Sequence, residues 1–218
     1  MRDNLKNKAY YQAYLDYQYV RIEKKTAKLE KSEGEKRQRV LLSLTSFEVD
    51  LLKAEFSYGA SQEDLKSLLI RAMNIISENK NVTYEDLLTL LSLAVMLEAG
   101  NNAKGLIDSN RNVIKEDRLL NYLSFYLETN SIVWDRNIPL KKEYVLLDCI
   151  FNAVDKESVL NEYLSKWYEA HKGFAWHNSH LRDTDTYCGY WSFESAAVAK
   201  IENMNLGKIN NSAYFPIL

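Results

Sequence analysis

One segment, residues 171–188, contains every histidine of the chain together with two aspartates and a cysteine. It reads HKGFAWHNSHLRDTDTYC, so groups that can bind a metal or transfer a proton lie close together in the sequence. Imidazole and carboxylate groups bind zinc or non-haem iron, but the spacing here matches no known ligand pattern. A metal-dependent enzyme that uses His177, His180 and Asp183 stays open as an alternative, and we expect the histidines to act as hydrogen-bonding groups.

Nucleophilic catalysis is the second chemistry that this segment allows, with Cys188 as the nucleophile and His177 or His180 as its base. Nothing beside Cys188 in the sequence indicates an activated thiol. The chain also has no G-x-S-x-G, no glycine-rich phosphate loop, no H-E-x-x-H and no paired C-x-x-C. We therefore expect no catalytic residue, no cofactor and no bound metal, and we expect that the protein is not an enzyme.

The next stretch, GYWSFESAAVAKI, is predicted to lie in the last helix, over residues 189–203. On such a helix Tyr190, Glu194 and Ala197 share one stripe, and the alanines let a neighbouring helix come close. Glu194 is an acid in this apolar stripe, so it needs a hydrogen-bonding partner if it is buried. The candidate partners are His177, His180, Arg182 and a tyrosine hydroxyl. The pattern indicates a tight helical corner with a polar lock inside it.

Helical periodicity dominates the rest of the chain, and strand signals are nearly absent. Ser61 and Thr83 are predicted to cap two helices, with Asp64 and Asp86 in the first turns. The second of these helices is apolar on almost all sides, which is typical of a central buried helix. The predicted fold class is all-α, a multi-helix array in two parts with essentially no sheet. Helices are expected at 4–31, 36–58, 61–78, 83–97, 103–109, 114–128, 141–153 and 156–171, with an irregular stretch at 173–187.

The polar segment GNNAKGLIDSNRN is the best candidate for a joint between two halves. We expect an N-terminal helical domain over 1–112 and a C-terminal helical domain over 113–218.

The net charge of −2 hides an asymmetry along the chain. Residues 1–40 carry 11 Lys or Arg against 6 Asp or Glu, which leaves 17 against 24 in the remainder. An acidic body would repel the phosphate backbone, so direct nucleic-acid binding is not expected. Two cysteines imply no disulfide framework, and no apolar run is long enough for a membrane span. We expect a soluble, cytoplasmic protein.

The two ends of the chain together resemble one family. The start MRDNLKNKAYYQAYLDYQYVRIEK is similar to the N-terminal domain of PoNi-type immunity proteins. The segment from YLSKWYEAHKGF to AAVAKIENMN, followed by SAYFPIL, resembles their C-terminal domain. The resemblance implies a cytoplasmic protein that binds and neutralises a cognate polymorphic DNase toxin, often delivered by type VI secretion, by stoichiometric inhibition. A helical adaptor with a non-toxin partner is the alternative.

The resemblance also divides the candidate residues into two groups. The family-like residues, which we interpret as scaffold, are Gly189, Tyr190, Trp191, Phe193, Glu194, Ala197 and Lys200. The candidates for toxin contact or for the polar lock are Trp176, His177, His180, Asp183, Asp185 and Tyr187.

Overall fold

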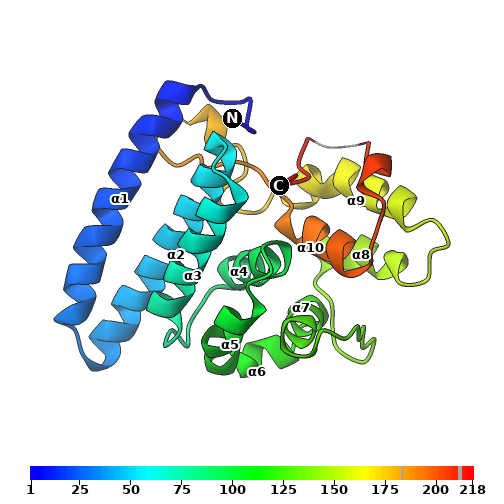
Figure 1. Ribbon diagram of the computed structural model, residues 1–218, viewed down its shortest axis with the longest axis horizontal. Helices are drawn as coiled ribbons and strands as arrows, with labels where there is room; N and C mark the ends of the chain where they lie inside the picture. The colour runs from blue at the N-terminus through cyan, green and yellow to red at the C-terminus, as the bar shows by residue number, and fades with distance from the viewer. Residues whose placement is uncertain (183, 211–212) are drawn as a thin grey trace.

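The computed structural model describes residues 1–182, 184–210 and 213–218, and these ranges form helices and loops without a strand, as predicted. Figure 1 shows α1, α2 and α3 together on one side, α5, α6 and α7 along the lower edge, and α8, α9 and α10 on the other side. The helices are α1 Lys8–Glu30, α2 Gly34–Tyr58, α3 Gln62–Ile76, α4 Tyr84–Met96, α5 Gly100–Ser109, α6 Arg111–Lys115, α7 Arg118–Thr129, α8 Val145–Ile150, α9 Lys156–Ala170 and α10 Phe193–Ile201. Short 3₁₀ turns occupy Lys142–Tyr144, Ser179–Leu181 and Leu206–Lys208.

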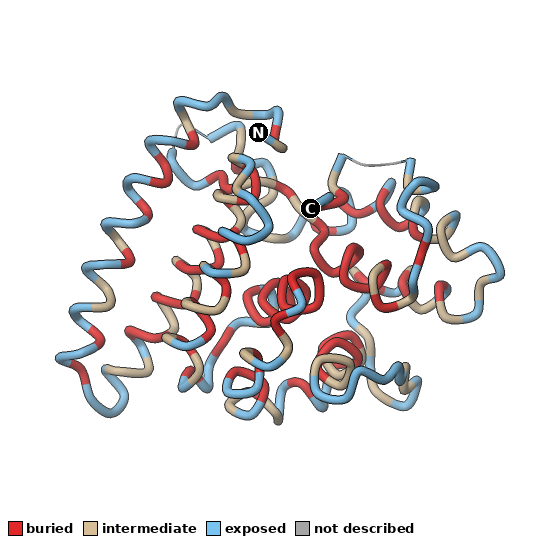
Figure 2. The backbone as a smooth tube through the Cα atoms, viewed as in Figure 1, coloured by how far each residue is buried: buried red, intermediate tan, exposed pale blue. Residues whose placement is uncertain are grey.

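Helix α4 is the centre of the fold. All its residues from Asp86 to Met96 are buried, and it contacts α2, α3, α5, α7 and α10. Figure 2 shows this helix as a buried coil surrounded by helices that are exposed on their outer faces. Thr83 caps α4 by accepting a hydrogen bond of 3.1 Å from the N–H of Asp86, and Ser61 caps α3 in the same way. The predicted central helix and both predicted caps are confirmed.

The last helix starts later than predicted. Residues 189–192 are not helical, and α10 begins at Phe193. Gly189 has a φ of +110°, which lies outside the helical region, and the N–H of Ser192 donates to the carbonyl of Tyr214 at 2.8 Å. The predicted stripe that joined Tyr190 to Glu194 on one helix face is therefore wrong, because a long-range hydrogen bond holds the preceding residues in a non-helical path.

Other predicted boundaries also shift. The first helix begins at Lys8 rather than at residue 4, because the Asn7 side chain accepts a hydrogen bond from the Tyr10 N–H at 2.9 Å. Residues 100–109 form α5, so the segment predicted as a joint is largely helical. The predicted helix over 141–153 is reduced to a 3₁₀ turn and the short α8. The domain boundary at residue 112 stays a prediction.

Residues 187–191 press against the end of α2. Ser57 Oγ donates to the carbonyl of Cys188 at 2.8 Å and accepts from the Trp191 indole N–H at 2.8 Å. A Cβ on Gly189 would collide with Ser57 Oγ and Trp191 Nε1. The backbone N–H groups of Arg2 and Asp3 both donate to the Ser57 carbonyl. One turn of α2 therefore holds the start of the chain and residues 187–191 together.

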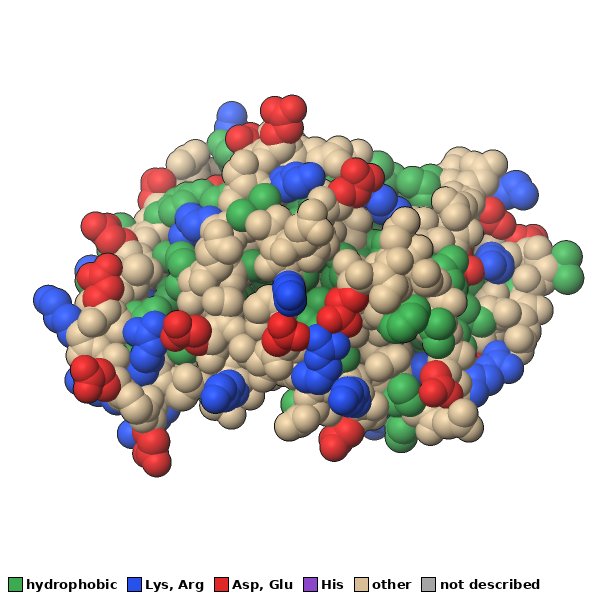
Figure 3. All heavy atoms as spheres, turned by 60° about the horizontal axis from the view of Figure 1, so that its bottom comes forward, with side chains coloured by type: hydrophobic (Ala, Val, Ile, Leu, Met, Phe, Trp, Pro, Cys, Tyr) green, Lys and Arg blue, Asp and Glu red, His purple; other side chains and the backbone are tan. Residues whose placement is uncertain are grey.

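The surface carries both signs of charge. Figure 3 shows a face on which Lys and Arg side chains alternate with Asp and Glu side chains, so this face has no single-sign field. Over the described ranges, no helix is both long and apolar enough to cross a membrane.

Gly189→Ala should strongly destabilise the fold. A left-handed backbone costs an L-residue about 1–2 kcal/mol, and overpacking typically adds about 1–3 kcal/mol. We expect the free energy of unfolding to fall by several kcal/mol, measured by urea denaturation. The control is Gly173→Ala, because a Cβ there meets nothing within 4 Å. Equal midpoints for the two variants would contradict this close-approach account.

Candidate functional site

Glu194 is the buried acid that the sequence singled out, and it accepts three hydrogen bonds. The donors to its Oε1 are the Tyr163 hydroxyl at 2.7 Å, the Trp167 indole N–H at 2.7 Å and the Ser192 hydroxyl at 2.6 Å. Burial and the charge of Glu194 hold the pKa of Tyr163 well above its usual value, so this hydroxyl stays protonated and donates. The expected polar lock is present, and a tyrosine hydroxyl is one of its partners.

The histidine and arginine candidates for that role make other contacts. The Nδ1 of His180 lies 2.8 Å from the Tyr190 hydroxyl, and Arg182 donates to the carbonyls of Ala175 and His177. The ring of His177 lies 4.2 Å from that of Tyr168. These contacts fold the loop after α9 back on itself, so they fix its shape.

Stacked aromatic rings hold the same loop against α9 and the C-terminal tail. The rings of Trp167 and Trp176 stack at 5.2 Å with an interplanar angle of 18°, and those of Tyr168 and Tyr214 stack at 5.5 Å and 8°. Such pairs add to the free energy gained from burial. The loop therefore presents Trp176, which is half-buried, in a defined position.

The remaining predicted site residues do not converge on one point. Tyr187 is buried and donates its hydroxyl proton to Asp3 at 2.5 Å, whereas Asp185 is exposed. Asp183 lies outside the described residues. Among the residues that the structure describes, no three His, Cys, Asp or Glu side chains are grouped so that they could hold a metal ion.

Cys188 is not placed as a nucleophile. Its thiol is buried and lies 3.8 Å from Asp50 Oδ1, and no hydrogen bond to a histidine is found in the described part of the chain. Burial and the nearby Asp50 carboxylate raise the pKa of the Cys188 thiol. A raised pKa disfavours the reactive thiolate, and the Cys–His pair that the sequence allowed is not formed.

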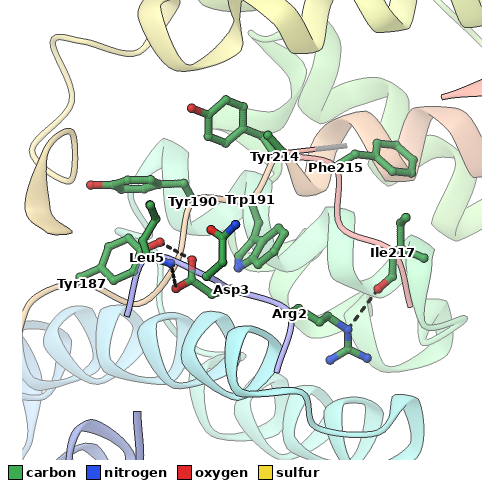
Figure 4. A pocket seen from close by; sticks show the side chains of 11 residues that line it. Arg2, Asp3, Leu5, Tyr187, Tyr190, Trp191, Tyr214, Phe215 and Ile217 are labelled. Carbon is green, nitrogen blue, oxygen red and sulfur yellow. Dashed lines mark hydrogen bonds between the residues drawn. The ribbon is translucent and has the colours of Figure 1, made fainter. Parts of the chain in front are cut away.

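Residues 187–191 border two cavities. The first, of about 450 Å³, lies between the start of the chain and the C-terminal tail (Figure 4). Arg2 spans one end of it, where its side chain donates to the carbonyl of Ile217 at 3.1 Å. Tyr187, Tyr190 and Trp191 contribute rings to its wall. Residues from the two ends of the chain form most of the wall of this cavity.

The second cavity, of about 330 Å³, is charged. Its walls come from α2, the start of α4, the end of α9 and residues 174–176 and 186–191. They carry four carboxylates and one ammonium group, those of Asp50, Glu85, Asp86, Glu194 and Lys53. The indoles of Trp167, Trp176 and Trp191 and the ring of Tyr144 form apolar parts of the wall. We call this the charged cavity.

Sequence reasoning missed most of the charged cavity. The sequence did not indicate that Asp50, Lys53 and Glu85 lie together. The available signal was the stretch FEVDLLKAEF, in which an acid and a base three residues apart interrupt the apolar face of α2. Residues three apart lie on one side of a helix, so both point toward the same neighbour.

Burial shifts the ionisation of these groups. It raises the pKa of Asp50 to about 6, against the opposing attraction of Lys53. Burial and the neighbouring Asp86 raise the pKa of Glu85 in the same direction. Burial lowers the pKa of Lys53, but the acidic groups around it, including Cys188 and Asp50, outweigh that effect and raise it. The free protein therefore keeps incompletely compensated charge in a recess.

Two family models match the chain, one over residues 2–108 and the other over residues 115–217. Both describe immunity proteins, and together they cover nearly the whole chain, so the class of protein is that of an immunity protein. The models are the N-terminal and C-terminal models of PoNe immunity proteins (PoNi), and the chain belongs to that family. The resemblance seen at the two ends of the sequence is confirmed. No curated protein and no solved structure matches the chain.

Glu194→Gln should weaken the polar lock. The change keeps the shape but removes the charge that strengthens three buried hydrogen bonds, which typically costs about 1–3 kcal/mol. Thermal unfolding should show a lower midpoint than for the wild type. Glu116→Gln is the control, because this exposed side chain makes no hydrogen bond or ion pair among the described residues. A midpoint equal to that of the control would show that the charge of Glu194 does not stabilise the fold.

Asp50→Asn should stabilise the protein at neutral pH. The folded-state pKa of Asp50, about 6, lies above its ordinary value of 3.8, so the folded protein favours the neutral carboxyl. The contribution of Asp50 to the free energy of unfolding is fully present below about pH 4 and is lost as the pH rises through about 6. Asparagine cannot ionise, and we expect a gain of about 1–2 kcal/mol above pH 7, discounted for partial solvent screening.

Thermal midpoints of Asp50→Asn and the wild type, measured from pH 4 to pH 8, check this expectation. The two curves should separate as the pH rises. The charged and titratable groups that act on Asp50 are Lys53, Asp86, Arg21 and Cys188, and they are unchanged in the variant. A variant that is less stable than the wild type at pH 8 would mean that the charged form of Asp50 stabilises the fold.

Proposed function

We propose that this protein neutralises a cognate DNA-cleaving toxin by binding it stoichiometrically in the bacterial cytoplasm. The match of both PoNe immunity models along the chain carries the proposal, because this family implies immunity by neutralisation of a toxin. That the toxin is a DNase, and that a type VI secretion system delivers it between cells, belongs to the same proposal. The protein acts in it as an inhibitor and performs no chemistry on the toxin.

The rigidity of the fold supports a binding role. The loop after α9 is held by stacked rings and by the hydrogen bonds of His180 and Arg182, and Glu194 fixes the start of α10 to α9. A surface that is already ordered loses little conformational entropy when a partner docks on it. Preorganisation of this kind favours a tight and long-lived complex.

Charge also supports a nuclease as the partner. A DNA-cleaving enzyme binds phosphates with Lys and Arg side chains, so its active-site cleft is basic. Beyond residue 40 this chain carries 24 acidic against 17 basic residues. Opposite net charge speeds the encounter of two proteins.

Mixing experiments with the nuclease encoded beside this gene test the proposal. We expect DNA cleavage to stop at a molar ratio of about one to one, because each inhibitor occupies one toxin molecule. A complex of the two proteins should elute together in gel filtration. Full protection at a small fraction of that ratio, or a covalently changed toxin in mass spectrometry, would mean that the protein acts catalytically. Absence of a complex would favour a helical adaptor with another partner.

A further inference from the structure

The charged cavity contains two carboxylates that the protein leaves without a strong partner. Within the described ranges, neither Asp50 nor Glu85 takes part in an ion pair, and the hydrogen-bond contact found for Asp50 is the weak one from the Cys188 thiol at 3.8 Å. Asp86 differs, because it accepts a hydrogen bond of 2.8 Å from Ser46. Glu194 belongs to the polar lock. Asp50 and Glu85 are therefore the acids with unused hydrogen-bonding capacity.

Lys53 attracts both acids but pairs directly with neither. Its ammonium group lines the same cavity, but it lies in no ion pair within the described part of the chain. One ammonium group and the imidazole of His171 face four carboxylates, so the acidic groups of the cavity outnumber the basic ones. A desolvated negative site gains most from a cation that brings hydrogen-bond donors with it.

The walls of the cavity suit a flat cation. Trp176 and Trp191 are half-buried, and their indoles are the ring type that attracts cations most strongly. The chain already uses this interaction beside the cavity and elsewhere. Lys141 lies 3.8 Å from the ring centroid of Tyr84, and Arg21 lies 3.7 Å from that of Phe47. The charged cavity thus combines free carboxylates with ring faces that no cation of the described chain covers.

We propose that the charged cavity receives an arginine side chain of the toxin, with the guanidinium between the indoles and hydrogen-bonded to Asp50 and Glu85. The proposal rests on the proposed function, since it assigns a contact within that complex. A guanidinium is planar, stacks on aromatic rings and gives paired hydrogen bonds to carboxylates, whereas an ammonium is compact and strongly hydrated. The volume of about 330 Å³ lies at the lower end of small-ligand pockets. One long side chain fits such a space.

This contact explains why an immunity protein would retain unpaired acids. A nuclease uses arginine to bind phosphate, and a recessed carboxylate pair offers that arginine a competing anionic partner. Occupation of the cavity would take a phosphate-binding group away from DNA. The inhibitor would then imitate the substrate at one position.

The double variant Asp50→Asn with Glu85→Gln tests the contact. We expect its affinity for the neighbouring nuclease to fall at least about tenfold, measured by isothermal titration calorimetry. Its thermal midpoint should equal or exceed that of the wild type, because the folded protein raises the pKa of both carboxyls and so disfavours their charged forms. The matched control is Glu23→Gln with Glu116→Gln, which removes the same net charge from exposed positions. Equal affinity of the two double variants would overturn the inference and leave the proposed function standing.

A probe without the toxin separates the two proposals. Agmatine carries the arginine side chain, and it should shift the indole N–H signals of Trp176 and Trp191 in NMR spectra. The Trp134 signal is the internal reference, because that ring lies outside the charged cavity. If the wild type does not bind the nuclease, the proposed function fails. In that case, agmatine shifts that appear in the wild type and vanish in the Asp50→Asn, Glu85→Gln variant would still support a guanidinium site. If agmatine causes no shift in the wild type, the proposed guanidinium site is overturned.

Discussion

The contact between Gly189 and the side chain of Ser57 is the constraint on which the rest of the site depends. The absence of a Cβ lets residues 187–191 lie directly on the last turn of α2, where Ser57 Oγ bridges the Cys188 carbonyl and the Trp191 indole. That approach sets the direction in which the chain enters α10, and it places Cys188 and Trp191 in the wall of the charged cavity. Any side chain at position 189 would separate α2 from this segment and open both cavities.

Two acids in the wall of the charged cavity show how one fold treats charge in opposite ways. Glu194 accepts three short hydrogen bonds from side chains that are themselves buried, so its position is fixed and its charge is dispersed. Asp50 has a weak thiol contact, and burial raises its pKa to about 6. A satisfied acid stabilises a fold, whereas an acid that the fold leaves short of partners keeps free energy available for binding. This difference, more than the number of acids, distinguishes scaffold from candidate contact.

Local signals predicted the elements well, and long-range contacts account for the errors. The caps at Ser61 and Thr83 depend on residues three positions away, and the uniform apolar character of α4 predicts its burial without further knowledge. The predicted start of α10 is wrong because the N–H of Ser192 donates to the carbonyl of Tyr214, a partner that no local pattern reveals. The charged cavity was missed for the same reason. Asp50, Glu85 and Asp86 come from α2 and α4, while its indole walls come from α9 and from loops more than 80 residues later.

The joining of the chain start to residues 187–191 also has a consequence for the order of biosynthesis. Asp3 and Tyr10 bond to Tyr187, and Arg2 bonds to Ile217, so these contacts span 177 to 215 positions. A ribosome must synthesise the chain as far as Tyr187 before the first of these contacts can form, and closing such long loops slows folding. The start of the chain is therefore synthesised well before Tyr187 and Ile217, its partners in the folded protein. A chain that ended before residue 187 would leave Asp3 and Tyr10 without their Tyr187 partner and only the contacts with α2 to hold the first residues.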